Sequence, residues 1–150
     1  MSRIVPCPAC GQMNRLAEGR TAAGAHCPAC KAVLFDGKPL TLHRANFDRQ
    51  IKSPDLPVIV DFWASWCGPC RAMAPVFERA AADYGDRLRF SKVETDAEQE
   101  LAARYQIRSI PTLILFRGGR EIDRVSGALG AGDLRAFIGR HGIAPAGQHA

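Results

Sequence analysis

The stretch that decides the fold is Val60-Asp61-Phe62-Trp63-Ala64-Ser65-Trp66-Cys67-Gly68-Pro69-Cys70. It begins inside a β-branched and aromatic run, residues 58–63, which predicts a buried strand. A helix is expected to follow at about residues 69–84, because apolar side chains recur there at helical spacing. Pro69 suits the first turn of that helix, where its missing N–H costs no hydrogen bond. A strand that leads directly into a helix favours parallel pairing with the next strand.

The rest of the chain continues this alternation. Further strands are predicted at residues 88–93, 112–116 and 121–125. Further helices are predicted at residues 44–52, after a cap at Asp96, and around residues 134–138. A short helix thus precedes the order β-α-β-α-β-β-α, which predicts an α/β fold with a central mixed β-sheet flanked by helices on both faces.

Length and composition limit the class of protein. The chain has 150 residues, enough for one domain and a small appendage. Hydrophobic residues make up 47% and charged residues 23%, the balance of a globular chain. No apolar run approaches the ~20 residues that cross a bilayer, so we expect no membrane span. The first residues lack the apolar core of a signal peptide, so we expect a cytoplasmic, reducing location. The net charge of +5 is weak support for nucleic-acid binding, which we do not expect.

All six cysteines occur in Cys-x-x-Cys pairs, and the first two pairs have the spacing of a structural zinc site. Two tight turns can aim four thiolates at one Zn²⁺ ion, and metal binding would stabilise a segment too short to fold alone. The alternatives are two disulfides, unconnected thiols, or a site in which His26 replaces one cysteine. We therefore predict a zinc ribbon-like module at residues 1–36, followed by the main domain at 37–143 and a flexible tail at 144–150. The expected zinc ligands are Cys7, Cys10, Cys27 and Cys30.

The third pair, Cys67 and Cys70, differs because it has no partner pair and lies where the strand passes into the helix. At a helix N-terminus, free backbone N–H groups and the helix dipole stabilise a thiolate. The second cysteine follows one turn later, within reach of a disulfide. We expect Cys67 to be the nucleophile and Cys70 the resolving thiol. The alternative is half of a metal site shared in an oligomer.

The quoted stretch closely resembles the active-site segment of the thioredoxin family. Ile110-Pro111-Thr112 resembles the family's cis-proline loop, and Val125-Ser126-Gly127-Ala128-Leu129 resembles its glycine-containing loop. The resemblance covers about residues 40–142 and implies a thioredoxin fold. The cysteine-rich extension departs from ordinary thioredoxins and is similar to the thioredoxin 2 branch, bacterial cytosolic proteins with an N-terminal zinc-binding module.

Asp61 stands out as an acid in an otherwise apolar strand. Burial would raise its pKa, so it could take a proton from Cys70, although the pattern alone also allows an outward-facing Asp. The resemblance favours the buried proton acceptor and implies that Lys92 modulates it. It also implies a cis peptide bond before Pro111 that helps position substrate. The expected substrate-binding residues are Trp66, Gly68, Pro69, Ile110, Gly127 and Ala128.

These features together predict a protein-disulfide reductase, a thiol-disulfide oxidoreductase that takes part in electron transport and cell redox homeostasis. The resemblance implies disulfide-containing proteins as substrates and an NADPH-dependent thioredoxin reductase as electron donor. We expect one structural Zn²⁺, no bound organic cofactor and a monomer. The zinc module is expected to tune the redox response, because thiolates that form disulfides must leave the metal. The alternative is a zinc-dependent client-binding or chaperone module with secondary redox activity.

Overall fold

The molecule is organised around a five-stranded mixed sheet with the order β3-β5-β4-β6-β7. The computed structural model describes residues 2–17 and 24–147. The strands are β3 (Leu40–Thr41), β4 (Val58–Trp63), β5 (Arg89–Glu94), β6 (Thr112–Arg117) and β7 (Arg120–Ser126). Strands β3, β5 and β4 are parallel, whereas β6 and β7 are antiparallel to their neighbours. The predicted mixed sheet is therefore confirmed, and the two-residue strand β3 is an addition that was too short to produce a pattern.

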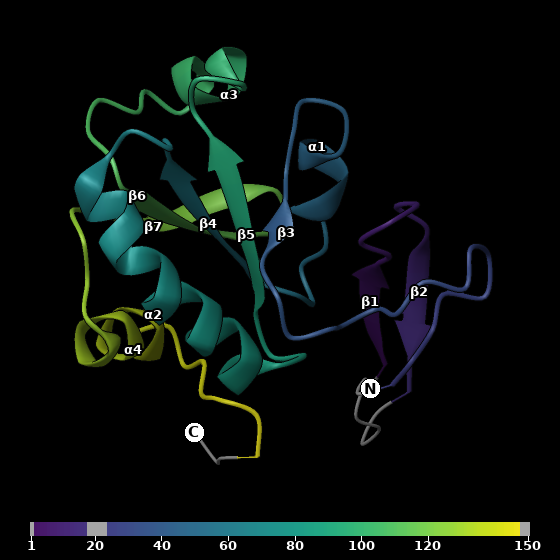
Figure 1. Ribbon diagram of the computed structural model, residues 1–150. Helices are drawn as coiled ribbons and strands as arrows, with labels where there is room; N and C mark the ends of the chain where they lie inside the picture. Colours follow the sequence, from purple (N-terminus) through teal and green to yellow (C-terminus); the bar gives the residue numbers. More distant parts are fainter. Residues whose placement is uncertain (1, 18–23, 148–150) are drawn as a thin grey trace.

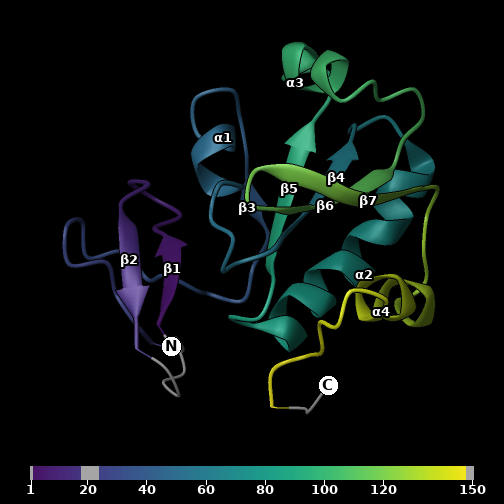
Figure 2. The same ribbon diagram turned by 180° about the vertical axis from the view of Figure 1, so that it is seen from behind.

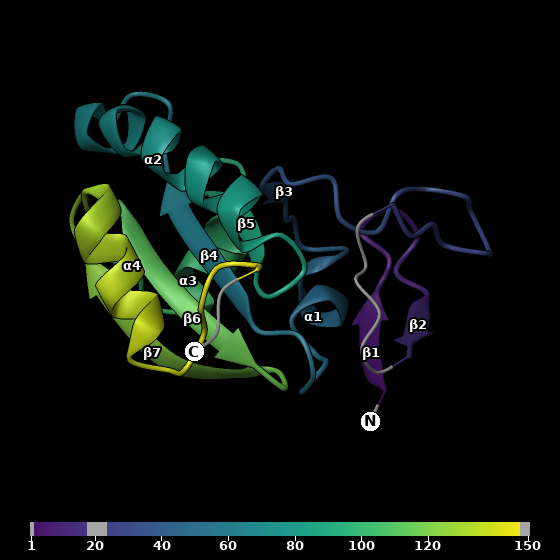
Figure 3. The ribbon, with the colours of Figure 1, turned by 90° about the horizontal axis from the view of Figure 1, so that it is seen from below.

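Helices cover both faces of this sheet, as predicted. They are α1 (Phe47–Gln50), α2 (Gly68–Tyr84), α3 (Gln99–Arg104) and α4 (Ala131–Gly139). Figure 3 shows α2 and α4 together on one side of the sheet. Apolar side chains of these two helices share a core with Ile59 and Leu113, whereas α1 and α3 pack on the opposite face with Val60 and Ile114. Side chains at alternate positions of β4 and β6 thus enter different cores, because a strand presents successive residues to opposite faces.

The predicted cap of the third helix is wrong. Helix α3 begins after Glu98, which occupies the N-cap position without a side-chain bond. The carboxylate of Asp96 instead accepts a hydrogen bond of 2.8 Å from the indole nitrogen of Trp66. Asp96 therefore joins the strand-to-helix turn after β4 to the turn after β5.

The N-terminal segment forms a separate hairpin beside the β3 edge of the sheet (Figures 1 and 2). Its strands are β1 (Arg3–Pro6) and β2 (Met13–Leu16), which pair antiparallel. Val5, Leu34 and Phe35 pack with the main-domain residue Leu56 in one small core. Strands of four residues are too short for a recognisable period, so the sequence did not predict this hairpin.

The C-terminal segment follows α4 back toward α2. Pro145 is buried, and the Ala146 N–H donates a hydrogen bond of 3.0 Å to the carbonyl oxygen of Asp83. The part of the predicted tail at residues 148–150 lies outside the described residues. None of the helices in the described part of the chain is long and apolar enough to cross a membrane.

Candidate active site and metal site

Cys67 and Cys70 form a disulfide at the start of α2, with their Cα atoms 5.3 Å apart. Cys67 is the N-cap of this helix, and its sulfur accepts a hydrogen bond of 3.2 Å from the Cys70 backbone N–H. Pro69 lies in the first turn, as predicted. This geometry gives the Cys67 sulfur a backbone donor and the positive end of a 17-residue helix, and both favour a thiolate once the disulfide is reduced.

Three loops that are far apart in the sequence meet at this disulfide. The Cys67 sulfur lies 3.8 Å from the carbonyl oxygen of Ile110, and the Ile110–Pro111 peptide bond is cis. The Gly127 N–H donates a hydrogen bond of 2.8 Å to the carbonyl oxygen of Pro111. Gly127 has a φ of 98°, which favours glycine, and it holds the third loop beside the second.

Most of the predicted substrate-binding residues around the disulfide are exposed. Trp66 is 66% exposed, a high value for a tryptophan side chain. Ile110 is half-buried, and the other predicted substrate-binding residues are exposed: Gly68, Pro69, Gly127 and Ala128. Ile110 contacts the Cys67 sulfur, and Gly127 is hydrogen-bonded to Pro111. Trp66, Gly68 and Pro69 lie beside the redox cysteines in the chain, and Ala128 follows Gly127.

Asp61 is buried below the active-site turn, with only 1% of its surface exposed. Neither carboxylate oxygen has a hydrogen-bond partner among the described residues. Burial raises the pKa of Asp61 to about 7, and the nearby positive charge of Lys92 opposes this rise. Lys92 is the β5 partner of Asp61 in the sheet register, and its ammonium lies 4.6 Å from the centre of the Trp63 ring.

The first four cysteines form a compact cluster in the N-terminal module. The sulfurs of Cys7, Cys10, Cys27 and Cys30 all lie within 4.8 Å of one another, so they are close enough to bind one metal ion. The Cys7–Cys30 and Cys10–Cys27 sulfur distances are 3.5 and 3.7 Å. None of the four cysteines forms a disulfide in this structure, so the alternative of two disulfides does not hold here.

Each Cys-x-x-Cys pair adopts the same tight turn. The Gly11 N–H bonds to the carbonyl oxygen of Cys7, and the Lys31 N–H bonds in the same way to Cys27. Both donors have positive φ, 80° for Gly11 and 69° for Lys31. The sequence repeat is thus a structural repeat, and Lys31 adopts a left-handed conformation that its residue type did not predict.

Arg89 is a structural residue that sequence analysis missed. It is 5% exposed and donates hydrogen bonds to the carbonyl oxygens of Leu34, at 2.8 Å, and Pro6, at 3.3 Å. Its guanidinium also lies 4.2 Å from the centre of the Phe35 ring. Burial lowers the pKa of Arg89 to about 10, so the group remains a cation at neutral pH. The signal in the sequence was an arginine inside a predicted strand.

Gln50 makes a similar contact from α1. Its side chain is 2% exposed and donates a hydrogen bond of 2.8 Å to the carbonyl oxygen of Cys7. Together Arg89 and Gln50 bind carbonyl oxygens of the module, one of them on a cysteine of the cluster. The module is therefore docked against the main domain through buried polar contacts.

A disulfide at the start of a helix, placed directly after the central strand of a mixed sheet, defines the class of thiol-disulfide oxidoreductases. The thioredoxin family profile matches residues 38–140. The chain belongs to the thioredoxin family.

Individual relatives agree with this assignment. The chain is 39% identical over 135 residues to thioredoxin C-3 of Corynebacterium nephridii, covering 90% of this chain and 92% of the relative. It is 42% identical over 98 residues to a bifunctional thioredoxin reductase/thioredoxin of Mycobacterium leprae, covering 65% of this chain and 21% of that protein. A mutant thioredoxin from Halobacterium salinarum has a similar solved structure, with a TM-score of 0.62 and 33% identity over 69% of this chain and 90% of that one.

Proposed function

We propose that this protein-disulfide reductase uses Cys67 as nucleophile and Cys70 as resolving thiol. The observation that carries this assignment is the position of the Cys67 sulfur at the N-cap of α2, where it accepts the Cys70 N–H. The Cys67 thiolate attacks a substrate disulfide, forms a mixed disulfide and releases the first substrate sulfur as a thiolate. Cys70 then attacks the Cys67 sulfur, and the second substrate sulfur leaves as the Cys67–Cys70 disulfide forms.

Asp61 is proposed to accept the proton of Cys70 before that second attack. Its burial and its lack of a hydrogen-bond partner keep its pKa near the working pH, which suits a general base. Lys92 modulates this group through its positive charge. The proton passes through water, since no direct contact joins Asp61 to Cys70 among the described hydrogen bonds.

Substrate binding is proposed at the exposed rim formed by Trp66, Gly68, Pro69, Ile110, Gly127 and Ala128. An extended polypeptide that lies beside residues 110–111 could form backbone hydrogen bonds there, as an added strand does. Pro111 helps to position it. The small side chains at the rim allow the substrate backbone to approach, and the Trp66 ring offers apolar contact area.

One structural Zn²⁺ is proposed in the N-terminal module. Four sulfurs around Zn²⁺, each at about 2.3 Å, would lie about 3.8 Å from one another, which agrees with the sulfur distances of 3.5 and 3.7 Å. When bound, the ion would stabilise the two turns and would take no part in electron transfer. No bound organic cofactor is proposed.

The zinc module supports assignment to the thioredoxin 2 branch and a role in tuning the redox response, because oxidation of the four cysteines would release the metal. The match to thioredoxin C-3 covers 90% of the chain, so it extends into this module. A cytoplasmic location is proposed because cysteines that are not paired in disulfides are typical of a reducing compartment.

The proposed partners are disulfide-containing proteins and an NADPH-dependent thioredoxin reductase. The Mycobacterium leprae relative, whose name joins reductase and thioredoxin, supports the second of these. The protein is proposed to act as a monomer, away from nucleic acids and membranes.

Reduction of insulin by single-cysteine variants tests the central assignment. Cys67→Ser should abolish activity, whereas Cys70→Ser should accumulate mixed disulfides with substrate that dithiothreitol releases. The matched control is Ala72→Ser, which places the same new side chain at an exposed position of α2 outside the redox pair and the four-cysteine cluster. Retained activity in Cys67→Ser would refute the nucleophile assignment.

A further inference from the structure

A pocket of ≈ 370 Å³, open to solvent on one side, lies where the N-terminal module joins the main domain. Three elements line it: the connecting segment that precedes β3, helix α2 and strand β5. The lining residues are Gly37, Lys38, Pro39, Glu78 and Lys92. Three of the five carry a charge, so the cavity suits water and a mobile proton.

We infer that this cavity is the route by which the proton of Asp61 exchanges with solvent, and that Glu78 and Lys38 are positioning residues that control how readily Asp61 takes up and releases it. The inference deepens the proposed function, because it rests on Asp61 as proton acceptor.

Lys92 connects the buried acid to the cavity. It lies directly opposite Asp61 in the β4–β5 register, and residues opposite one another in neighbouring strands point to the same face of the sheet. Lys92 also lines the cavity. Asp61 is 1% exposed, so a proton that leaves it needs a neighbouring path to water. A cavity of this size holds several water molecules beside the Lys92 side chain.

Charged groups lie on three of the segments that border Asp61 or the cavity, and Lys92 is the one that acts directly on the Asp61 carboxyl. Strand β5 contributes Lys92 and, two residues further on the same face, Glu94. Helix α2 contributes the redox cysteines at its start and Glu78 farther along, and the connecting segment contributes Lys38. On the β6 side, Asp61 pairs with the apolar Leu113. Glu78 and Lys38 thus oppose each other in charge at the outer wall of the cavity.

The proton balance of the reaction requires such a route. Cys70 gives its proton to the Asp61 carboxylate and becomes the thiolate that attacks the mixed disulfide. The departing substrate thiolate takes a proton from solvent. Asp61 must then return its own proton to solvent before the next cycle, and the cavity lined by its strand partner Lys92 is a charged space open to solvent.

Docking of the module holds part of this cavity in place. Phe35 packs in the core shared with Leu56 and lies against the buried Arg89 guanidinium. Asp36 follows Phe35 in the chain, and its side-chain carboxylate accepts a hydrogen bond of 2.9 Å from the Lys38 N–H. The contacts that dock the module therefore also hold Lys38 and Pro39 at the mouth of the cavity, which gives the module a role in the reaction besides metal binding.

The experiment measures the protonation midpoint of Asp61 in the full chain, by the pH dependence of its carboxyl ¹³C resonance and of single-turnover insulin reduction. Glu78→Gln removes a negative charge and should lower the midpoint. Lys38→Met removes a positive charge and should raise it. A charge about 10 Å away in a water-like medium shifts such a midpoint by about 0.3 pH unit. Thermal unfolding and metal content check that each variant folds.

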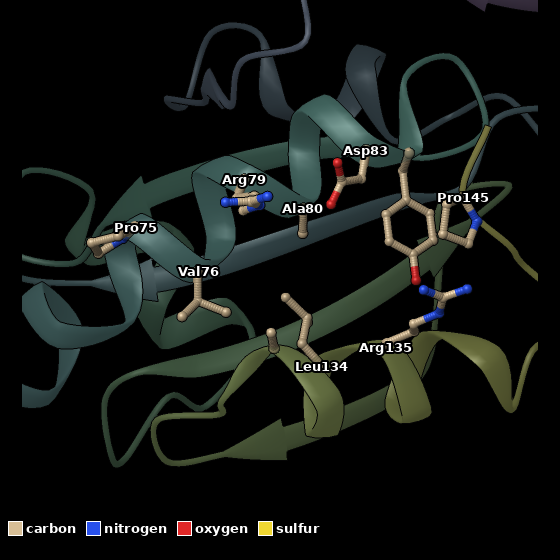
Figure 4. Close-up of a pocket in the computed structure, with 10 residues that line it drawn as sticks. Pro75, Val76, Arg79, Ala80, Asp83, Leu134, Arg135 and Pro145 are labelled. Atoms are coloured by element: carbon tan, nitrogen blue, oxygen red, sulfur yellow. The ribbon is translucent and has the colours of Figure 1, made fainter. Parts of the chain in front are cut away.

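Matched controls are Asp83→Asn and Lys52→Met. Asp83 is an exposed acid on the same helix as Glu78, but it lines a separate cavity between α2 and α4 (Figure 4). Lys52 is an exposed lysine after α1. Opposite shifts in the two test variants, with none in the controls, support the inference. Shifts of the same sign, or shifts no larger than those of the controls, overturn it.

A further variant separates failure of the inference from failure of the proposed function. If Asp61→Asn retains the pH profile of the parent, Asp61 is not the proton acceptor and the proposed role of this acid fails. The ¹³C titration of the Glu78 and Lys38 variants still reports whether the cavity charges act on Asp61.

Discussion

Replacing Asp61 with Asn should remove a large pH dependence of stability. The Asp61 carboxyl has a pKa of about 7 in the folded chain, raised by burial, against 3.8 for the ordinary group. Between these values the folded state holds a proton that the unfolded state has lost, so stability falls as pH rises. At 1.36 kcal/mol per pH unit, the wild-type protein loses about 4 kcal/mol through this group between pH 4 and pH 8.

Urea denaturation of the oxidised protein at pH 4 to 9 measures this loss. Other titrating groups act equally on both proteins, so the difference in unfolding free energy between Asp61→Asn and wild type isolates the contribution of Asp61. We expect the variant to gain about 4 kcal/mol relative to wild type from pH 4 to pH 8, with little change above that. Asp83→Asn, at an exposed site, is the control. A difference that stays constant across the pH range would show that Asp61 is not a buried acid with a raised pKa.

Three further changes test the module and the substrate rim. Arg89→Met should lower the free energy of unfolding by about 3 kcal/mol, because two carbonyl oxygens of the module lose a charged donor. Arg87→Met, at an exposed site, should leave it unchanged. Equal stability of the two variants in urea denaturation would contradict the docking role of Arg89. Chelation of the metal should make four additional thiols react with Ellman's reagent and should make residues 2–17 sensitive to proteolysis. An unchanged number of reactive thiols would argue against a metal ion in the cluster. Trp66→Ala should raise KM for insulin about tenfold at constant kcat, because the exposed ring no longer contacts the substrate. An equal rise in KM for a small disulfide such as oxidised glutathione would argue against protein docking at this ring.

Local sequence patterns predicted the structure correctly where neighbouring residues decide the backbone conformation. The β-branched run before the active-site turn predicted β4, and the helical spacing after it predicted α2 almost to its ends. The position of Cys67 at the helix start followed from the same stretch. The repeated Cys-x-x-Cys spacing likewise predicted a four-sulfur cluster, because each tight turn is determined by the few residues within it.

Patterns failed where the partner lies far along the chain. Asp96 looked like a helix cap, but its carboxylate binds the Trp66 indole, 30 residues earlier. Arg89 looked like an ordinary strand residue, yet it bonds to carbonyl oxygens 55 and 83 residues away. Such bonds depend on how separate elements pack, and residue types near Asp96 or Arg89 carry no information about that packing.

The amino-acid sequence by itself determined the chemistry available to this protein: a redox pair of cysteines at a helix start, an acid in an apolar strand and a quartet of thiols. The tertiary structure alone decided how these parts act on one another. It buried Asp61 opposite Lys92, brought Ile110 to the Cys67 sulfur and Gly127 to Pro111, and made the segment after the module part of the cavity wall beside Lys92. The physical reason is that backbone conformation follows from nearby residues, whereas desolvation and charge interactions follow from the packing of distant ones.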